Sequence, residues 1–417
     1  MAQKGYRLAS DLLIALGAFF LSNASALVYV LWLTPEIVTF ELVLWLILSA
    51  FILWMLKNNN LIPVFIEGIK KNKFILPFVL FSGLSIFWSV YWEISLQRWL
   101  ILLFTILAGG YIGLNYDINK IIELISVFGI YTLLFSALLV FFVPDLGVQN
   151  YYTIQGAWQG IYWHKNHMGL ITAFANLLFL INIIRCLQIG KGSVFPWVLL
   201  YLFSLVFAIK TDSVATYMTM IILHGAVILL LLLLKYGKNL RRSHYLAFFA
   251  ILILASLILF TNLDLIFGLF NRSTSLTGRV PMWTYLFNTF FSKRPILGYG
   301  FNAFWYIEKY RIELKYAAGY PDQIVIADNG FIDMLVNIGI LGFALFAVFY
   351  IGMWRRSIQH ALKATDINGL FPVLLMAYTL IANISWSLMF ESEGFFMLIM
   401  FCILFSLSAN HAVQQEN

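Results

Sequence analysis

The feature that most constrains this chain is a succession of apolar runs, each long enough to cross a membrane as a helix. Of the 417 residues, 62% are hydrophobic and 11% are charged, whereas soluble domains carry about 25% charged residues. A helix needs about 20 apolar residues to span the hydrocarbon core, and barrel strands would be shorter and alternating. The sequence therefore predicts an all-α, polytopic integral membrane protein and excludes a soluble fold.

Runs of this size occur about twelve times. They predict transmembrane helices near residues 11–33, 38–56, 74–91, 96–114, 121–143, 168–187, 194–209, 212–234, 246–268, 329–354, 369–385 and 390–408. We interpret 1–417 as a single membrane domain, with one long loop at 269–327 between the ninth and tenth spans.

The basic residues predict which side each connection faces. Most of the 26 Lys and Arg residues fall in connections that would share one side with both termini, and cytoplasmic connections are normally rich in these residues. Both termini are therefore expected in the cytoplasm, with the long loop in the periplasm or exterior. The net charge of +7 then needs no nucleic-acid partner.

Three basic residues, Arg98, Lys165 and Lys210, are exceptions at short outward-facing ends. A cationic outer face favours an anionic ligand at the membrane surface, although cations facing lipid headgroups would look the same. Arg98 enters an apolar run, where a cation faces a cavity or a partner or extends to the nearby surface. The two cysteines, Cys186 and Cys402, indicate neither a disulfide framework nor a metal site, and no cofactor is expected.

The long loop contains the stretch "LTGRVPMWTYLFNTFFSKRPILGYGFNAFW" at 276–305. Thr277 and Pro281 are typical of a helix start. They predict a short interfacial helix over 280–292 with one apolar face, made of Trp283, Leu286, Phe287, Phe290 and Phe291. Arg279 at its N-terminus would favour an anion and bind phosphate with two hydrogen bonds, and "RPILGYG" would end the helix in a tight turn. An amphipathic lid without a chemical role is the alternative.

The stretch "QGAWQGIYWHKNHMG" at 155–169 precedes the sixth predicted span. Its consecutive polar residues, His164, Lys165, Asn166 and His167, offer donors to a phosphate or a sugar at the outward mouth of the bundle. An interfacial loop anchored by its aromatic residues is the alternative. A metal site is not favoured, because no Cys or acidic residue lies nearby in the sequence.

The stretch "ADNGFIDMLVNIGILG" at 327–342 opens the tenth predicted span. Asp328 lies at the membrane boundary, and Asn329, Asp333 and Asn337 follow one another at helical spacing on one face. A polar stripe in an apolar span is expected to face the bundle or a cavity. Glu391, in "MFESEGFF", adds a carboxylate near the last outward turn.

In this order, these motifs resemble the bacterial O-antigen ligase and polysaccharide polymerase family, most closely its exopolysaccharide polymerase branch. The matching stretches are "WSVYWEISLQRW", "GIYWHKNHMG", "TGRVPMW…RPILGYGFNAFW" and "DNGFIDMLVNIGILG", with a weaker "FESEG". The resemblance implies an inner-membrane, metal-independent, inverting glycosyltransferase that takes glycan from an undecaprenyl-diphosphate carrier on the outer side. A polymerase passes it to a carrier-linked repeat unit, and a ligase to lipid A core or another acceptor; both stay open here. A polytopic transporter is a second alternative.

The resemblance also implies roles for residues. Arg279 matches the loop arginine of the family, and the basic positions of the earlier motifs match Arg98, Lys165 and Lys210, so these four are expected to bind the diphosphate. Where the family usually has His-Asn, this chain has Asp328-Asn329. We therefore expect Asp328, or else Glu391 or His164, to take the acceptor proton.

The remaining candidates, His164, Asn166, Asn329 and Asp333, are expected to bind or position the sugar. Expected partners are a polyprenyl-diphosphate-linked oligosaccharide, membrane lipid, and chain-length regulator or export proteins.

Overall fold

The computed structural model shows a bundle of helices. It describes residues 17–18, 36–151, 154–190, 192–236, 243, 247, 250–251, 254, 279–319, 326–389 and 394–409. Within these residues, six helices are long and apolar enough to cross a membrane, or seven if one bent pair counts as a span. The six are α6 (Trp92–Asn115), α7 (Ile118–Phe142), α9 (Lys165–Ile189), α11 (Val214–Tyr236), α16 (Gly330–Ala361) and α17 (Ile367–Ser385). The helical membrane class is confirmed, whereas the count of twelve spans is not.

The other predicted spans differ from simple crossings. The span predicted near 74–91 is divided into a 3-10 turn, the helix α5 (Leu76–Leu84) and a second 3-10 turn. Two further predicted spans form shorter apolar helices, α10 (Phe195–Lys210) and α18 (Phe395–Ser406). The spans predicted at 11–33 and 246–268 lie almost wholly outside the described residues.

Two features were not predicted from the sequence. Helix α3 (Glu36–Asn58) is followed by α4 (Ile62–Lys71), and the two are bent by 107°. After the short helix α8 (Pro144–Gly147), the strands β1 (Val148–Tyr151) and β2 (Ile154–Trp158) form an antiparallel hairpin. Helix α4, helix α8 and the two strands are short, so their periodicity is too weak to distinguish them from loops.

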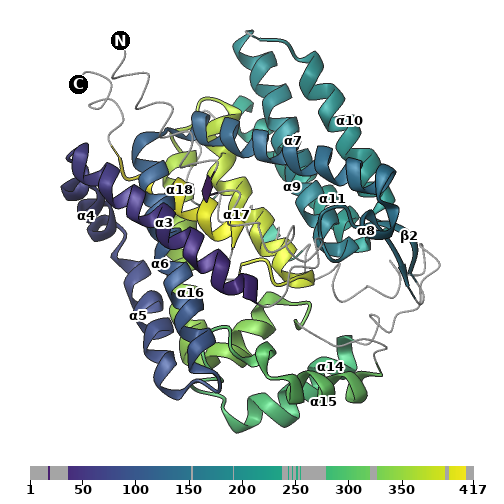
Figure 1. Ribbon diagram of the computed structural model, residues 1–417. Coiled ribbons are helices and arrows are strands. Elements are labelled where there is room, and N and C mark those ends of the chain that lie inside the picture. Colours follow the sequence, from purple (N-terminus) through teal and green to yellow (C-terminus); the bar gives the residue numbers. More distant parts are fainter. Residues whose placement is uncertain are drawn as a thin grey trace.

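Helix α17 is the centre of the bundle. Most of its length is buried, and it packs against α9, α11 and α16 (Figure 1). On one side of the bundle, α6 and α18 lie in close contact. A Cβ atom at Gly113 would lie 2.2 Å from the backbone oxygen of Cys402, so the two backbones approach as closely as small residues allow in membrane helix pairs.

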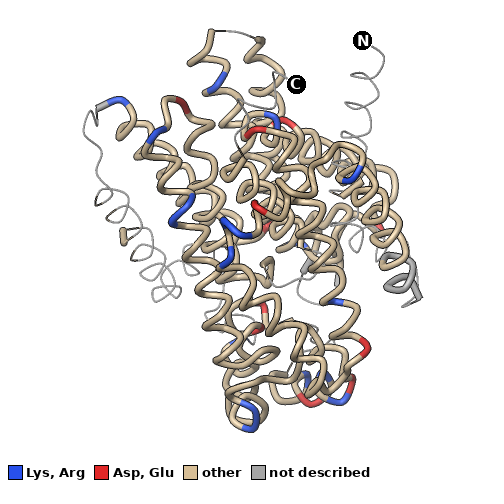
Figure 2. The backbone as a smooth tube through the Cα atoms, turned by 90° about the vertical axis from the view of Figure 1, so that its left-hand side faces the viewer, with Lys and Arg blue, Asp and Glu red and all other residues tan. Residues whose placement is uncertain are grey.

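The long loop packs at the end of the bundle where α6 and α16 begin (Figure 1); we call this the loop end. Its helices are α14 (Arg279–Tyr285), which continues through a π-helical turn to Phe290, and α15 (Glu308–Ala318). Lys, Arg, Asp and Glu are mixed where α14 and α15 lie (Figure 2). The N-termini of α6 and α16 lie beside this loop. In the orientation predicted from the basic residues, these are the outward ends of the two helices.

The helix predicted over 280–292 is confirmed, but its buried face is different. Met282, Leu286 and Phe290 are buried in a small core that the loop shares with Val336 of α16, while Phe287 and Phe291 are half-buried and contact each other. The helix packs on other parts of the loop rather than presenting its whole predicted apolar face outward. The buried positions are four apart, so they lie on one face of the helix.

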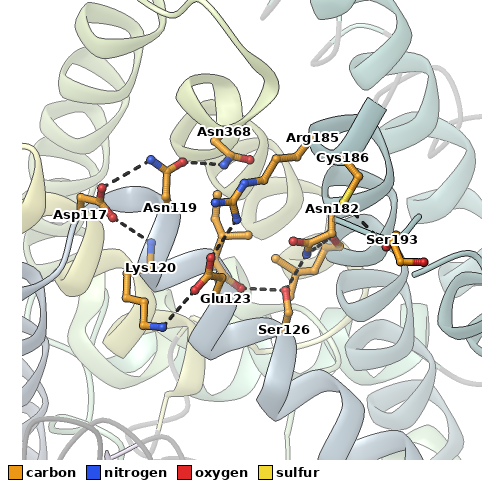
Figure 3. Close-up of polar contacts among 12 residues, drawn as sticks. Asp117, Asn119, Lys120, Glu123, Ser126, Asn182, Arg185, Cys186, Ser193 and Asn368 are labelled. Atoms are coloured by element: carbon orange, nitrogen blue, oxygen red, sulfur yellow. Dashed lines mark hydrogen bonds and ion pairs between the residues drawn. The ribbon is translucent and has the colours of Figure 1, made fainter. Parts of the chain in front are cut away.

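At the opposite end, polar contacts join α7, α9 and α17 (Figure 3). Arg185 of α9 pairs with Glu123 of α7 at 3.1 Å, and the amide of Asn368 in α17 donates to Asn119 in α7 at 2.5 Å. Asp117 accepts from the backbone N–H of Lys120 at the start of α7. These contacts fix the relative positions of the three helices far from the loop end.

Candidate functional site

The site begins with an ion pair between α14 and the residue that precedes the cap of α16. The Nε of Arg279 lies 3.1 Å from Oδ2 of Asp328, and the two side chains are 12% and 21% exposed. One turn later in α14, the indole of Trp283 donates to the backbone oxygen of Ala327 at 2.7 Å. These contacts hold α14 against the start of α16 at two neighbouring points.

The surroundings of Asp328 perturb its acidity in two directions. Burial raises the pKa of its carboxyl above the ordinary value, while the charge of Arg279 and the hydrogen bond from it act in the opposite direction. Its backbone has φ 53°, a conformation that non-glycine residues adopt uncommonly and that is often found at functional sites. The carboxylate is therefore held in place by an unusual backbone turn and by one cation.

His164 lies close to the same arginine and caps α9. Its Nδ1 accepts a hydrogen bond from the backbone N–H of Asn166 at 3.1 Å. Burial, together with the positive charges of Arg279 and Lys165, lowers the pKa of its imidazole to about 3. The ring is therefore neutral near pH 7, and because Nδ1 is an acceptor, the hydrogen is on Nε2. His164 can donate a hydrogen bond there but is a poor base.

The first backbone N–H groups of α9 are already used within the protein. The N–H of Lys165 donates to the side-chain oxygen of Gln149 at 3.0 Å, and that of Met168 donates to the backbone oxygen of His164 at 3.1 Å. The Lys165 and Asn166 bonds thus occupy two of the N–H groups that a helix start leaves without helical partners and that would otherwise attract an anion. Any anion bound here must be attracted mainly by side chains.

Lys165 joins this region to the connection between α10 and α11. Its buried ammonium donates to the backbone oxygen of Asp212 at 2.9 Å and lies 3.4 Å from its carboxylate. Lys210 is exposed at the last position of α10, two residues earlier. Lys165 is thus placed both near His164 and beside this helix connection, whereas Lys210 lies on the exposed side of the connection.

Arg98 is buried in α6 and belongs to a different set of contacts. Its guanidinium donates to the hydroxyl of Tyr306 and lies 5.4 Å from the centre of that ring. One turn earlier in α6, Ser95 donates to the backbone oxygen of Phe301 at 3.0 Å. Arg98 therefore helps to anchor the loop to α6, and its convergence with Arg279 and Lys210 in one pocket stays a prediction.

The polar stripe of α16 holds the loop in place. Asp333 accepts hydrogen bonds from the indole of Trp305 at 2.7 Å, from the N–H of Ala327 at 3.0 Å, and from the hydroxyl of Ser387. Asn337 accepts from the N–H of Phe304 at 3.1 Å. These contacts place the stripe, which was expected to face the bundle or a cavity, against the loop and the end of α17, and the Asp333 carboxylate accepts three hydrogen bonds there.

Asn329 caps α16 and connects it to α17. Its side-chain oxygen accepts from the backbone N–H groups of Phe331 and Ile332, and its amide donates to the backbone oxygen of Ile384 at 3.0 Å. These contacts give Asn329 a structural task beside the role in sugar positioning predicted from the sequence.

Two residues at the end of α17 were missed by the sequence analysis. Trp386 is buried, with its ring centre 5.4 Å from that of His164 and 5.6 Å from that of His167. Ser387 follows it and contacts Asp333. The end of α17 thus joins the His164 region to the carboxylate that holds the loop. Only the polar serine in an apolar stretch could have drawn attention to them.

The "RPILGYG" turn enters a break in α16 at Gly339, which has φ 65°. Across the break, the N–H groups of Tyr299 and Gly300 donate to Val336 and Asn337 of α16. The N–H groups of Ile340 and Leu341 donate in return to Pro295 and Ile296 of the turn. Backbone groups freed inside a membrane helix must find other partners. Here the turn supplies these partners, so its backbone completes the hydrogen bonding of α16 at the break.

Two expected residues remain to be placed. Asn166 is half-buried at the start of α9, beside His164. Glu391 lies outside the described residues. Within the described part of the chain, no group of three or more His, Cys, Asp or Glu side chains is arranged to hold a metal ion. The geometry instead brings together Arg279, Asp328, His164 and Lys165 at the loop end.

Comparison with known proteins supports the resemblance found in the motifs. Residues 197–347 match the model of a family described as O-antigen ligase. The matched segment includes Arg279, Asp328 and the first half of α16, and it supports the O-antigen ligase and polymerase family. No curated protein matches the chain.

Proposed function

We propose that this protein is a membrane glycosyltransferase that moves glycan from an undecaprenyl-diphosphate carrier to an acceptor sugar. The family match supports glycan transfer of the O-antigen ligase or polymerase type and favours it over the transporter alternative. The observation that carries the proposal is the partly buried pair of Arg279 and Asp328 beside the neutral imidazole of His164. This arrangement provides a fixed cation for a leaving diphosphate and a carboxylate for a proton.

The proposed reaction follows from these groups. As the bond between the anomeric carbon and the diphosphate breaks, negative charge grows on the carrier. A guanidinium cannot lose its charge and binds phosphate oxygens with two N–H groups, so Arg279 stabilises that charge. Lys165 adds positive charge nearby, and the Nε2–H of His164 can donate to a phosphate or sugar oxygen. Fixed charges of this kind need little reorganisation during the reaction.

Asp328 is the proposed general base. Its pKa is raised by burial, and a carboxylate whose pKa is moved towards neutrality is a better proton acceptor. His164 is a weaker candidate, because its unprotonated nitrogen already accepts from Asn166. Asp333 is occupied by three hydrogen bonds and is better assigned to positioning.

The polymerase role is our first choice, because the motifs are closest to that branch. Ligation is the second candidate, favoured by the description of the matched family. We further propose that the protein lies in the bacterial inner membrane with both termini in the cytoplasm. The loop end would then face the periplasm, where chain-length regulator or export proteins could contact it.

The direct test uses the purified full chain in lipid nanodiscs with a synthetic carrier-linked oligosaccharide. A polymerase lengthens the glycan on the carrier, and added lipid A core becomes glycosylated if the protein is a ligase. In a deletion strain, loss of polymerisation leaves carriers with single repeats, whereas loss of ligation leaves long polymer on the carrier. Absence of transfer to every acceptor would contradict the proposal.

A further inference from the structure

We propose that Arg279 acts as a donor-sensing lock on Asp328, so that binding of the carrier diphosphate breaks their ion pair and frees the carboxylate to accept the acceptor proton. This inference rests on the proposed function and adds an order to it: donor first, then acceptor activation. Two negative groups compete for the Arg279 guanidinium: the carboxylate of Asp328, with which it is paired here, and the diphosphate of the carrier.

The geometry allows Arg279 to exchange partners without unfolding the loop. The ion pair uses the Nε of Arg279 and one carboxylate oxygen of Asp328. A guanidinium has five N–H donors, and a diphosphate offers more oxygens and more charge than one carboxylate. Both sides of the pair are anchored independently of it, because Trp283 donates to Ala327 and Asn329 caps α16. The side chains can therefore separate while the backbones stay in place.

The surroundings of the pair give the lock its effect. Arg279 acts on His164, the N-cap of α9, which also feels the charges of Lys165 and His167, and Asp328 acts on Asp333 of α16. Arg279 contributes to Asp328 both a favourable charge and a hydrogen bond. When a diphosphate takes the guanidinium, that stabilisation of the carboxylate is lost while its burial remains. The carboxylate then binds a proton more readily.

The chemical step is balanced. The acceptor oxygen forms a bond to the anomeric carbon, and the bond from that carbon to the carrier diphosphate breaks. The electron pair leaves with the diphosphate, which Arg279 holds, and the hydroxyl proton passes to Asp328. In the absence of a donor, Arg279 keeps the carboxylate paired, so the acceptor hydroxyl is not activated without a sugar to receive it.

The test measures protonation of Asp328 by infrared difference spectroscopy on the full chain in nanodiscs. The C=O band that Asp328→Asn removes identifies this carboxyl, and its titration midpoint is compared with and without undecaprenyl diphosphate. We expect the carrier to raise the midpoint by about one to three pH units, the size of the effect of a close opposite charge. An unchanged or lowered midpoint at saturating carrier would overturn the inference.

A second measurement uses the reciprocity of linked equilibria. If the carrier raises the midpoint by one unit, protonation of Asp328 must tighten carrier binding about tenfold. The Kd for undecaprenyl diphosphate should therefore fall as the pH falls through the midpoint. Asp328→Asn should lose this dependence and leave only the titration of the carrier itself. Equal pH dependence in both proteins would contradict the lock.

The variant Arg279→Gln gives the matched prediction. Without the carrier, the titration midpoint of Asp328 in this variant should already be raised. The control is Lys309→Gln, which alters an exposed cation of α15 and should leave the midpoint as in the unmodified protein. An Asp328 midpoint in Arg279→Gln equal to that of the unmodified protein would contradict the inference. Because these readouts need only carrier binding, they are separate from the transfer assay, whose failure would instead contradict the proposed function.

Discussion

The Nε of Arg279 and Oδ2 of Asp328 lie 3.1 Å apart although the two residues are 49 positions apart in the chain. This pair joins the helix that begins the described part of the loop to the residue that precedes the cap of α16. It also sets the electrostatics of the site, since each charge is partly removed from solvent. The predictions below begin with these two side chains.

Replacing Arg279 by Gln should lower the transfer rate by a factor on the order of 10²–10³, as loss of one fixed donor to a developing charge does in other enzymes. Arg279→Lys should recover only part of the rate, because an ammonium cannot bind two phosphate oxygens in the fork geometry of arginine. Initial rates with carrier-linked oligosaccharide measure both. Polymer of normal length and yield from Arg279→Gln would remove this residue from the mechanism.

Asp328→Asn should abolish most turnover, and it should bind the carrier at least as tightly as the unmodified protein, because the carboxylate that competes for Arg279 is gone. In the unmodified protein, the base must be deprotonated, so the rate should fall as the pH drops through the pKa of Asp328. Because burial raises that pKa, the fall should occur at higher pH than for an ordinary carboxyl. A pH–rate profile measures it, and an acid limb retained unchanged in Asp328→Asn would assign the base elsewhere.

His164→Asn should keep the helix cap, because Asn is among the best N-cap residues, yet it removes the Nε2–H donor. We expect similar thermal stability with slower transfer. Since the pKa of His164 is about 3, the imidazole stays neutral between about pH 5 and 8 and its charge does not change there. The shape of the pH–rate profile should thus be unaltered; loss of an inflection near 6.5 would show that the ring titrates after all.

Gly339→Ala should disrupt the docking of the loop into α16. A Cβ there would lie 2.2 Å from the backbone oxygen of Ile296, and the backbone has φ 65°. Such a conformation alone costs on the order of 1–3 kcal/mol for a non-glycine residue. Thermal unfolding in detergent should show a lowered Tm, whereas Gly225→Ala is the control, since its Cβ would meet nothing within 4 Å.

Asp333→Asn should destabilise the loop by about 1–3 kcal/mol, the cost of leaving a buried polar group without its partner. An amide has one acceptor oxygen in place of the two that receive Trp305, Ala327 and Ser387. Ser387→Ala removes a single contact and should cost less. Denaturant or thermal unfolding compares the two, and equal stability of Asp333→Asn and the unmodified protein would contradict this structural role.

Local patterns in the sequence predicted two local structures around the site correctly. The start signals around Thr277 and Pro281 predicted the helix that Arg279 begins, and the spacing of Asn329, Asp333 and Asn337 predicted one polar face in α16. These predictions succeeded because helix starts and helical faces depend on residues only a few positions apart.

Other parts were not predictable from such patterns. The break at Gly339 exists because the 295–300 turn supplies partners to its backbone groups, and no local signal pairs these two segments. Tyr299 and Phe304 belong to the core against which the helix over 280–292 packs. Met282 is therefore buried, whereas Phe287 is only half-buried. Trp386 gains its place beside His164 only because α17 ends next to the start of α9.

The sequence by itself determined the membrane class, the motif order that leads to the family, and the residues able to carry charge and protons, because apolar length and side-chain chemistry are local properties. Only the tertiary structure decided that Arg279 pairs with Asp328, that the buried His164 is neutral with its hydrogen on Nε2, and that Asp333 holds the loop. These features depend on how burial and contacts of a few ångströms are distributed around each side chain, and for Asp328 and Asp333 the contacting groups come from segments far apart in the sequence.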